Sequence, residues 1–196
     1  MTQTFPLNPV LQPEDSAFID RTLCGDQKAF SQLMQRYLPA VYNYLYRMTQ
    51  NHEISEEIAQ EAFVKAYQNL KNFDRQRPFK PWILRIASNA AISQLRKQSK
   101  LVSLNAMEEA GTWTETEHQT AEDLVVQLER KLSTEEVLTA LQTLDDKYRQ
   151  ALLLRYQQDL SYEAVAETLG VPLNTVRTWI KRGTEKLKQA VKEMAS

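Results

Sequence analysis

The sequence has few residues that interrupt helices and few that build strands. Only four glycines and seven prolines occur among its 196 residues, and alternating runs of β-branched residues are scarce. Leu, Ala, Glu, Gln, Lys and Arg, which favour helices, dominate long stretches instead. We therefore predict an all-α fold.

The features of secreted, membrane and disulfide-bonded proteins are also missing. The single cysteine, Cys24, excludes an internal disulfide and a zinc site built from cysteines. The first residues have neither the charged start nor the apolar core of a signal peptide, and no apolar run approaches membrane-spanning length. We expect a cytoplasmic protein without membrane insertion.

Motifs for catalysis are absent as well. The two histidines, His52 and His118, are isolated, and Cys24 belongs to no recognisable motif. The chain has no glycine-rich phosphate loop and no metal-ligand spacing. We predict no enzymatic activity, no cofactor and no metal site.

The net charge of −1 conceals an uneven distribution. Residues 1–100 carry 13 basic and 9 acidic side chains, residues 101–135 carry 2 and 8, and residues 136–196 carry 9 and 8. Two lobes separated by an acidic stretch fit two surfaces for a polyanion, joined by a segment that avoids it. An acidic linker without a role would give the same distribution.

Helical periodicity divides the chain in the same way. Before residue 100, apolar residues recur at helical spacing. Clear helical spacing is lost over about 100–127, and it resumes toward the end of this stretch, by 121–132. We predict two small helical domains at 17–100 and 131–196, joined by an acidic flexible linker at 101–130.

Several helix ends can be placed within these domains. Pro39 is expected to end one helix and to supply the first turn of the next. Ser133 and Glu136 have the spacing of a capping box, and Asp145 is the expected N-cap of the following helix.

One face of the helix predicted over HEISEEIAQEAFVKAYQNL is acidic. Its apolar side chains fall on one side, which leaves Glu57, Gln60, Glu61 and Val64 on the other. An acidic face cannot bind DNA, so a functional face would meet a basic protein partner. From spacing alone, ordinary solvent-exposed helix surface is the simpler explanation.

The stretch 71–100 combines positive charge with aromatic residues. It holds eight basic residues and one acidic residue, with Phe73, Phe79 and Trp82 interleaved. Cations that follow a phosphate backbone and rings that stack on bases are expected for opened or single-stranded nucleic acid. The alternative is that all three rings are buried core residues, which fits Trp82 least because it lies on a polar stripe of its helix.

The stretch LGVPLNTVRTWIKRG predicts a helix-turn-helix. Gly170 permits the tight turn and Pro172 suits the first turn of the second helix. Between residues 175 and 192, six basic residues stand against one acidic residue, and this basic outer face suits the major groove of DNA. A helical hairpin with a solvated basic face is the alternative.

With these features in place, the chain resembles the sigma-70 family of bacterial RNA polymerase specificity subunits. Within this family, the chain resembles the short extracytoplasmic-function type, which keeps only the second and fourth sigma domains. EEIAQEAFVKAY is similar to the family's core-binding helix, and RPFKPWILRIASNAAISQLRK to its promoter-melting and minus-ten segment. The terminal LDDKYRQALLLRYQQDLSYEAVAETLGVPLNTVRTWIKRGTEKLKQ is similar to the domain that reads the minus-thirty-five element.

The resemblance implies a sigma factor that binds core RNA polymerase through its beta and beta-prime subunits and directs it to promoter DNA. It also implies an anti-sigma partner and an acidic linker that threads through the polymerase. The implied core-polymerase contacts are Glu57, Gln60, Glu61 and Phe63. The implied minus-ten and melting residues are Phe73, Arg75, Arg77, Phe79, Lys80, Trp82, Arg85, Asn89 and Arg96. The implied minus-thirty-five residues are Asn174, Thr175, Arg177, Thr178, Lys181 and Arg182.

Some positions depart from the family's usual residues. Ser93 stands where an Asp commonly precedes the Arg matched by Arg96, and Glu57 replaces the usual Asp. In the recognition helix the departures are Asn174 for Gly, Trp179 for Arg, and Gly183 and Thr184 for an Ala-Arg pair. These substitutions leave the promoter preference open.

A free-standing helix-turn-helix regulator is the alternative function. Its N-terminal lobe would serve dimerisation or ligand sensing. Such a regulator needs neither melting aromatics nor an acidic docking helix, so those two features distinguish the hypotheses.

Overall fold

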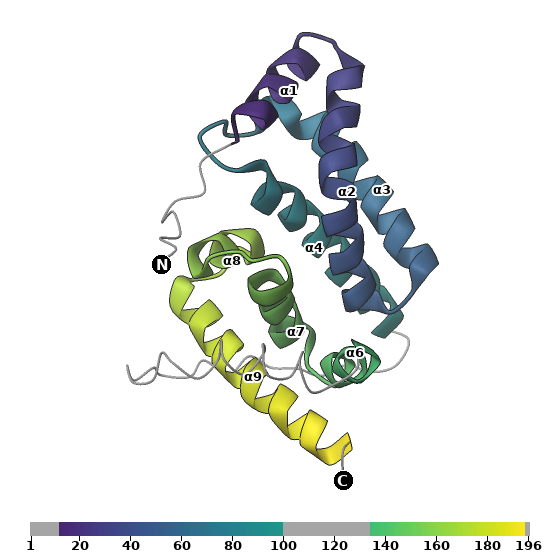
Figure 1. Cartoon of the computed structure of the whole chain (residues 1–196), viewed down its shortest axis with the longest axis vertical. Coiled ribbons are helices and arrows are strands. Elements are labelled where there is room, and N and C mark those ends of the chain that lie inside the picture. Colours follow the sequence, from purple (N-terminus) through teal and green to yellow (C-terminus); the bar gives the residue numbers. More distant parts are fainter. Residues whose placement is uncertain (1–11, 100–133, 195–196) are drawn as a thin grey trace, which may run out of the picture.

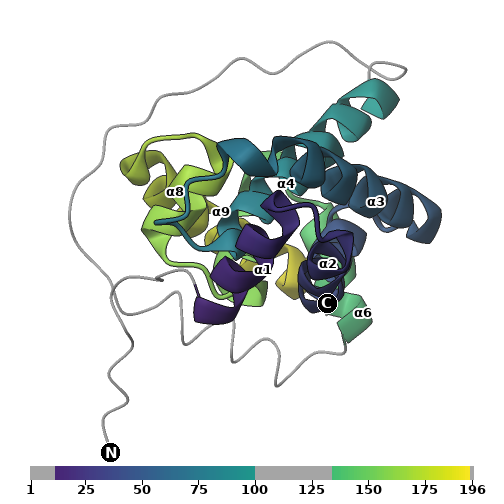
Figure 2. The ribbon, with the colours of Figure 1, turned by 90° about the horizontal axis from the view of Figure 1, so that it is seen from above.

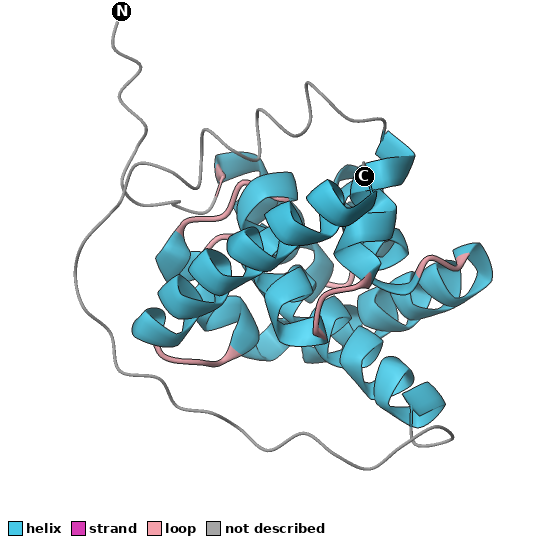
Figure 3. Cartoon of the chain, turned by 90° about the horizontal axis from the view of Figure 1, so that it is seen from below, coloured by secondary structure: helices cyan, strands magenta, loops and turns pink. Residues whose placement is uncertain are grey.

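The computed structural model describes residues 12–99 and 134–194, which fold into helices and the turns between them (Figures 1 and 3). No strand occurs in these two ranges, which confirms the predicted all-α fold. The predicted linker at 101–130 lies outside the described residues, and so does Ser133 of the predicted capping box.

The first lobe, at the top of Figure 1, contains four α-helices. They are α1 (Pro13–Leu23), α2 (Gln27–Thr49), α3 (His52–Asn69) and α4 (Phe79–Ser99), with a 3-10 turn at Leu70–Asn72. Side-chain caps begin two of them: Asp26 accepts from the N–H groups of Lys28 and Ala29, and Asn51 accepts from that of Ile54. Helices α3 and α4 both pack against α2.

Pro39 does not end a helix. It lies inside α2, which runs unbroken through 23 residues. A proline in a helix interior removes one backbone hydrogen bond and destabilises the helix by about 3 kcal/mol. Both halves of α2 bury apolar side chains in one core, among them Leu33, Val41 and Leu45. The predicted break was wrong because this tertiary packing outweighs the local cost.

The second lobe contains the remaining helices. They are α6 (Thr134–Gln142), α7 (Asp146–Leu152), a π-helical turn (Leu153–Gln157), α8 (Tyr162–Leu169) and α9 (Leu173–Met194). Asp145 occupies the N-cap position of α7 as predicted, but its side chain makes no capping hydrogen bond. It lies 3.9 Å from the Lys186 ammonium of α9 instead.

The two lobes pack against each other. Buried apolar side chains from both belong to one continuous cluster. Helix α4 contacts α2 and α3 within its own lobe and α8 of the second lobe. Figure 2 shows α4 and α8 from above. The turn that precedes α8 and the helix itself therefore come close to the segment that carries the predicted melting residues.

A cap at the start of α8 offers a test of the second lobe's local structure. The Ser161 hydroxyl accepts the Ala164 N–H at 3.2 Å. Replacing Ser161 with Ala leaves that N–H without its cap, so we expect the free energy of unfolding in urea to fall by about 1 kcal/mol. Ser31→Ala in the interior of α2, where the hydroxyl binds its own helix, should change it by less than about 0.5 kcal/mol. Equal effects of the two substitutions would contradict the capping role.

Candidate polymerase and nucleic-acid interfaces

Helix α3 has the two faces that its sequence predicts. Glu57, Gln60 and Glu61 are exposed, and Val64 beside them is 55% exposed. The opposite side is buried against α2 and α4; its members include Ile58, Ala59, Ala62 and Ala66. The exposed side, which we call the acidic face, therefore combines carboxylates with one accessible apolar side chain, a composition suited to a protein partner.

Phe63 does not lie on the acidic face. It is 2% exposed, and its ring meets Phe30 of α2 edge to face at 6.5 Å. Helical spacing puts it on the same side as Ala59 and Ala66, both buried. Phe63 therefore supports the acidic face from the core, which corrects its predicted role as a direct contact.

The three aromatic residues of the predicted melting segment form one cluster. The Trp82 ring lies 4.9 Å from Phe73 and 5.5 Å from Phe79, centroid to centroid. Phe79 is fully buried and Phe73 is 6% exposed, whereas Trp82 is half-buried. Phe73 and Phe79 are therefore core residues, as the alternative interpretation predicted, and Trp82 is the one ring of the three that is partly exposed.

The loop before α4 holds its cations in ion pairs. Arg75 Nη1 lies 2.5 Å from Asp20 of α1, and Arg77 Nε lies 3.1 Å from Asp74 within the loop. All four side chains are at least half exposed, and exposed pairs of this kind contribute little to stability. Phosphate groups could therefore displace these carboxylates at small cost.

Two cations of this segment also reach the second lobe. Arg77 pairs with Glu167 of α8, and the Lys80 ammonium donates to the backbone carbonyl of Gln158 at 2.6 Å. Burial lowers the pKa of Lys80, because desolvation disfavours its charged form. The side-chain donors of Arg77 and Lys80 thus bind acceptors of the second lobe.

A groove between α3 and α4 joins two of the predicted surfaces. Its volume is about 830 Å³, and its lining includes Glu57 and Glu61 of the acidic face and Trp82, Arg85 and Asn89 of α4. These residues are separate motifs in the sequence. The fold places the acidic face of α3 and the Trp82, Arg85 and Asn89 side chains of α4 around one hollow.

The departure at Ser93 has a local explanation. Its hydroxyl donates to the backbone carbonyl of Asn89, one turn earlier in α4, at 2.8 Å. This bond lies within the helix, so the Ser93 hydroxyl is occupied by the backbone of α4.

The helix-turn-helix has the predicted geometry. Gly170 has a φ of 68°, in the left-handed region, and ends α8. Val165, Val176 and Ile180 are buried where α8 and α9 pack together.

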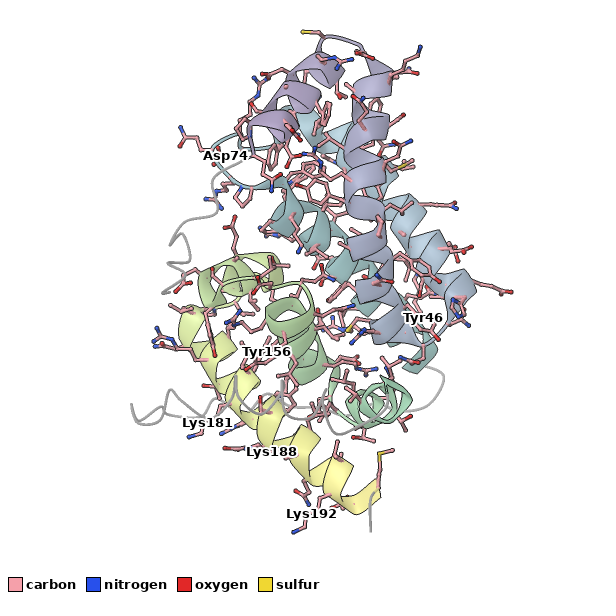
Figure 4. The ribbon with its side chains drawn as sticks, in the orientation of Figure 1. Tyr46, Asp74, Tyr156, Lys181, Lys188 and Lys192 are labelled. Atoms are coloured by element: carbon pink, nitrogen blue, oxygen red, sulfur yellow. The ribbon has the colours of Figure 1, made fainter. Side chains whose placement is uncertain are left out.

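The outer side of α9 is polar and basic. Asn174, Lys181 and Arg182 are exposed, and Thr175, Arg177 and Thr178 are half-buried. Figure 4 shows Lys181, Lys188 and Lys192 projecting from α9 away from the rest of the molecule. Short polar groups at the helix start and cations farther along match the way a recognition helix contacts base edges and phosphates.

Close packing of α9 on α7 explains the glycine at position 183. A Cβ there would stand 3.2 Å from Tyr148 Cβ and 3.2 Å from Leu152 Cδ1. The neighbouring departure, Trp179, is half-buried and packs against the apolar cluster. Both residues therefore serve the packing of α9 rather than its outer face.

Residues 12–99 and 134–194 contain neither a metal-ligand cluster nor a membrane-spanning helix. No group of three or more His, Cys, Asp or Glu that could hold a metal ion occurs there. No helix in these ranges is long and apolar enough to cross a membrane.

A buried arginine between the lobes was not predicted from the sequence. Arg149 of α7 is 7% exposed, and its Nη1 donates to the Met48 carbonyl at the end of α2 at 3.1 Å. Burial lowers its pKa, while Asp146, 2.6 Å from its Nη2, raises it. The local sequence, DDKYRQ, gives no sign of this role because the acceptor lies 101 residues away.

Two family models match most of the described chain. Residues 33–101 match the family model described as Sigma-70 region 2, and residues 134–187 match the one described as Sigma-70, region 4. The chain is 37% identical to an ECF RNA polymerase sigma factor, SigW, of Bacillus subtilis over 87% of its own length and 92% of the relative. It is 30% identical to the ECF RNA polymerase sigma-E factor of Escherichia coli, over 93% of this chain and 97% of that one.

Solved structures share the fold. CnrH, in its complex with the cytosolic domain of CnrY, superposes with a TM-score of 0.67 at 23% identity, covering 92% of this chain and 99% of CnrH. The sigma factor RpoE in complex with the anti-sigma factor NepR from Bartonella quintana gives a TM-score of 0.64 at 23% identity, covering 84% and 98% of the two chains.

Proposed function

Because this chain belongs to the sigma-70 family, among its extracytoplasmic-function members, we propose that its surfaces divide the work of a sigma factor between the two lobes. A sigma factor is a regulatory initiation factor, which joins core RNA polymerase and directs transcription from specific promoters. We assign residues 17–100 to polymerase binding, minus-ten recognition and melting, and residues 131–196 to minus-thirty-five recognition.

The groove between α3 and α4 is the observation that carries this proposal. A sigma factor must present one surface to the polymerase and one to opened DNA within the same domain. Glu57 and Glu61 line one side of the groove, and Trp82 and Arg85 line the other. A free-standing regulator has no use for this combination.

The acidic face would dock on a basic surface of the polymerase, with Glu57, Gln60 and Glu61 as contacts. Trp82, Arg85, Asn89 and Arg96 would approach the minus-ten element. Capture of bases that unpair spontaneously would favour the opened promoter without ATP. We place this action in the cytoplasm, where RNA polymerase works.

An anti-sigma protein is the partner that would control this chain. Two solved structures of similar fold were determined as complexes, one with the cytosolic domain of CnrY and one with the anti-sigma factor NepR. We propose that a protein of this class binds the acidic face or the minus-ten surface and so competes with polymerase or promoter.

Reconstitution with purified core RNA polymerase tests the proposal. The purified chain should bind core polymerase and start transcripts at discrete sites on genomic DNA, and core polymerase alone should not. If the chain binds specific duplex DNA tightly but does not bind core polymerase, it is a free-standing regulator and the proposal fails.

Arg177→Ala should weaken recognition of the upstream element. Arg177 lies half-buried in α9 beside the exposed Asn174 and Lys181. A recognition-helix arginine that contacts a base contributes about 1 to 3 kcal/mol, so we expect a loss of affinity for the minus-thirty-five duplex of about fivefold or more. Footprinting of the holoenzyme measures it, with Lys192→Ala at the far end of α9 as the comparison. An unchanged upstream footprint would remove Arg177 from the reading surface.

A further inference from the structure

Helix α1 carries none of the residues assigned to polymerase or DNA, yet polar side chains hold it firmly on α2. It precedes residues 33–101, which match the Sigma-70 region 2 model. Its inner side buries Asp15, Ile19 and Thr22, and two of these three are polar. Hydrogen bonds are directional, whereas apolar contacts are not. The inner side of α1 therefore fixes the rotation of the helix about its own axis as well as its contact with α2.

The buried carboxylate of Asp15, which is 1% exposed, is the anchor of α1. It accepts a hydrogen bond from the Tyr37 hydroxyl of α2, and Arg36 Nη1 lies 2.6 Å from it. Burial raises the pKa of the Tyr37 phenol, so the hydroxyl keeps its proton and can donate. Arg36 also pairs with Glu14 and lies over the Phe18 ring, 5.4 Å from its centroid. A buried carboxylate is costly without such donors, so α1 cannot rotate or slide along α2 freely.

This anchoring directs Asp20, on the exposed side of α1, at the loop between α3 and α4. Its carboxylate lies 2.5 Å from Arg75 Nη1 in that loop. Helix α1 also contacts the 3-10 turn Leu70–Asn72, with which the loop begins. Figure 4 shows Asp74, in the same loop, near α1. The loop that carries minus-ten candidates is therefore attached to a helix outside the segment that binds DNA.

The Asp20 carboxylate engages only one side of the Arg75 guanidinium. Within residues 12–99 and 134–194, Arg75 Nε and Nη2 have no partner. A guanidinium presents its donors as a rigid planar fork, so this free edge can bond the edge of an unpaired base while Nη1 stays with Asp20. The carboxylate also offsets the charge of Arg75, which weakens its attraction for the phosphates of any sequence.

We propose that Asp20 is a positioning residue for minus-ten recognition, which holds Arg75 with its free edge toward a base and weakens the binding of unrelated sequences. This inference rests on the proposed function, which assigns Arg75 to minus-ten DNA. Specificity is a difference between two affinities, so a carboxylate that never touches DNA increases it by making the wrong complex weaker. Helix α1 is the support that keeps this carboxylate in place.

The first experiment measures discrimination by the reconstituted holoenzyme. One probe is the single-stranded non-template minus-ten segment of a promoter that the holoenzyme transcribes, and the other is a strand of the same composition in scrambled order. The ratio of the two affinities is measured at one salt concentration. Asp20→Asn should lower this ratio by about two- to fivefold, the range of an exposed ion pair, chiefly through tighter binding of the scrambled strand. Asp20→Glu keeps a carboxylate and should restore the wild-type ratio.

Glu14→Gln is the matched control on the same helix. It removes the same charge, but Glu14 pairs with Arg36 and not with the loop, and Asp15 still holds Arg36. This variant should keep the wild-type ratio. Both carboxylates are exposed, so the two variants should match wild type in thermal unfolding and in affinity for core polymerase. An equal fall of the ratio in both variants would assign the effect to the charge of α1 and overturn the role of the Asp20–Arg75 pair.

Arg75→Gln shows whether Asp20 acts through Arg75. It should lower the ratio through weaker binding of the minus-ten strand, and adding Asp20→Asn should lower the ratio no further, because the two residues act as one unit. The inference is overturned if Asp20→Asn or Arg75→Gln alone leaves the ratio unchanged, or if the two effects add in the double variant. Failure of the wild-type chain to bind core polymerase would instead overturn the proposed function.

Discussion

Replacing Trp82 with Ala should reduce open-complex formation by roughly 10- to 100-fold, because one base stacked on an aromatic ring contributes about 1 to 3 kcal/mol. Trp82 is half-buried at the edge of the groove, with Arg85 and Asn89 beside it. Closed-complex formation depends on duplex contacts and polymerase docking, so it should change little. Permanganate reactivity of unpaired thymines measures opening, and a gel-shift assay of the holoenzyme measures closed binding.

The same ring packs on Phe73 and Phe79, so a structural role must be separated from a base-stacking role. Trp82→Phe keeps an aromatic ring at this place and should retain most open-complex formation. Thermal unfolding of the two variants shows how much the packing loss alone matters. If Trp82→Ala weakens closed and open complexes equally, the tryptophan is structural and does not stack on a base.

Reversing two charges on the acidic face should abolish polymerase binding at ordinary concentrations. Glu57→Lys with Glu61→Lys places like charges opposite a basic partner, which costs several kcal/mol at an interface. We expect the dissociation constant for core polymerase to rise about 100-fold or more. Both carboxylates are exposed, so the fold itself should keep its stability. Fluorescence anisotropy with a label on Cys24 measures the affinity.

The control for this double variant carries the same net charge on the other lobe. Glu163→Lys with Glu193→Lys changes two exposed residues of α8 and α9. It should bind core polymerase within about threefold of wild type, because surface charges far from an interface act mainly through screened long-range attraction. Equal losses in both double variants would show that net charge, and not the acidic face, governs binding.

The sequence alone predicted the helices and their faces well where one helix carries the whole pattern. Ile58, Ala59 and Ala62 alternate with Glu57, Gln60 and Glu61 at a spacing that only a helix can sort into two sides. Likewise, Gly170 and the apolar residues around it predicted the helix-turn-helix, because a left-handed residue between two amphipathic helices is a local property.

Burial of particular residues depended on neighbours that are distant in the chain. Trp82 and Phe79 are both aromatic and three residues apart, yet one is half-buried and the other fully buried. Pro39 predicted a break that packing on both halves of α2 prevents. Phe63 belongs to a docking motif by resemblance but lies in the core, because Phe30 of another helix covers it.

The sequence by itself determined the all-α class, the two faces of α3 and the outer face of α9, because helical periodicity and turn chemistry act within about a dozen residues. Only the tertiary structure decided that Glu57 and Trp82 share a groove and that Arg149 and Glu167 join the second lobe to the first. These contacts link residues from 25 to more than 100 positions apart, and they follow from how whole helices pack, which no local pattern encodes.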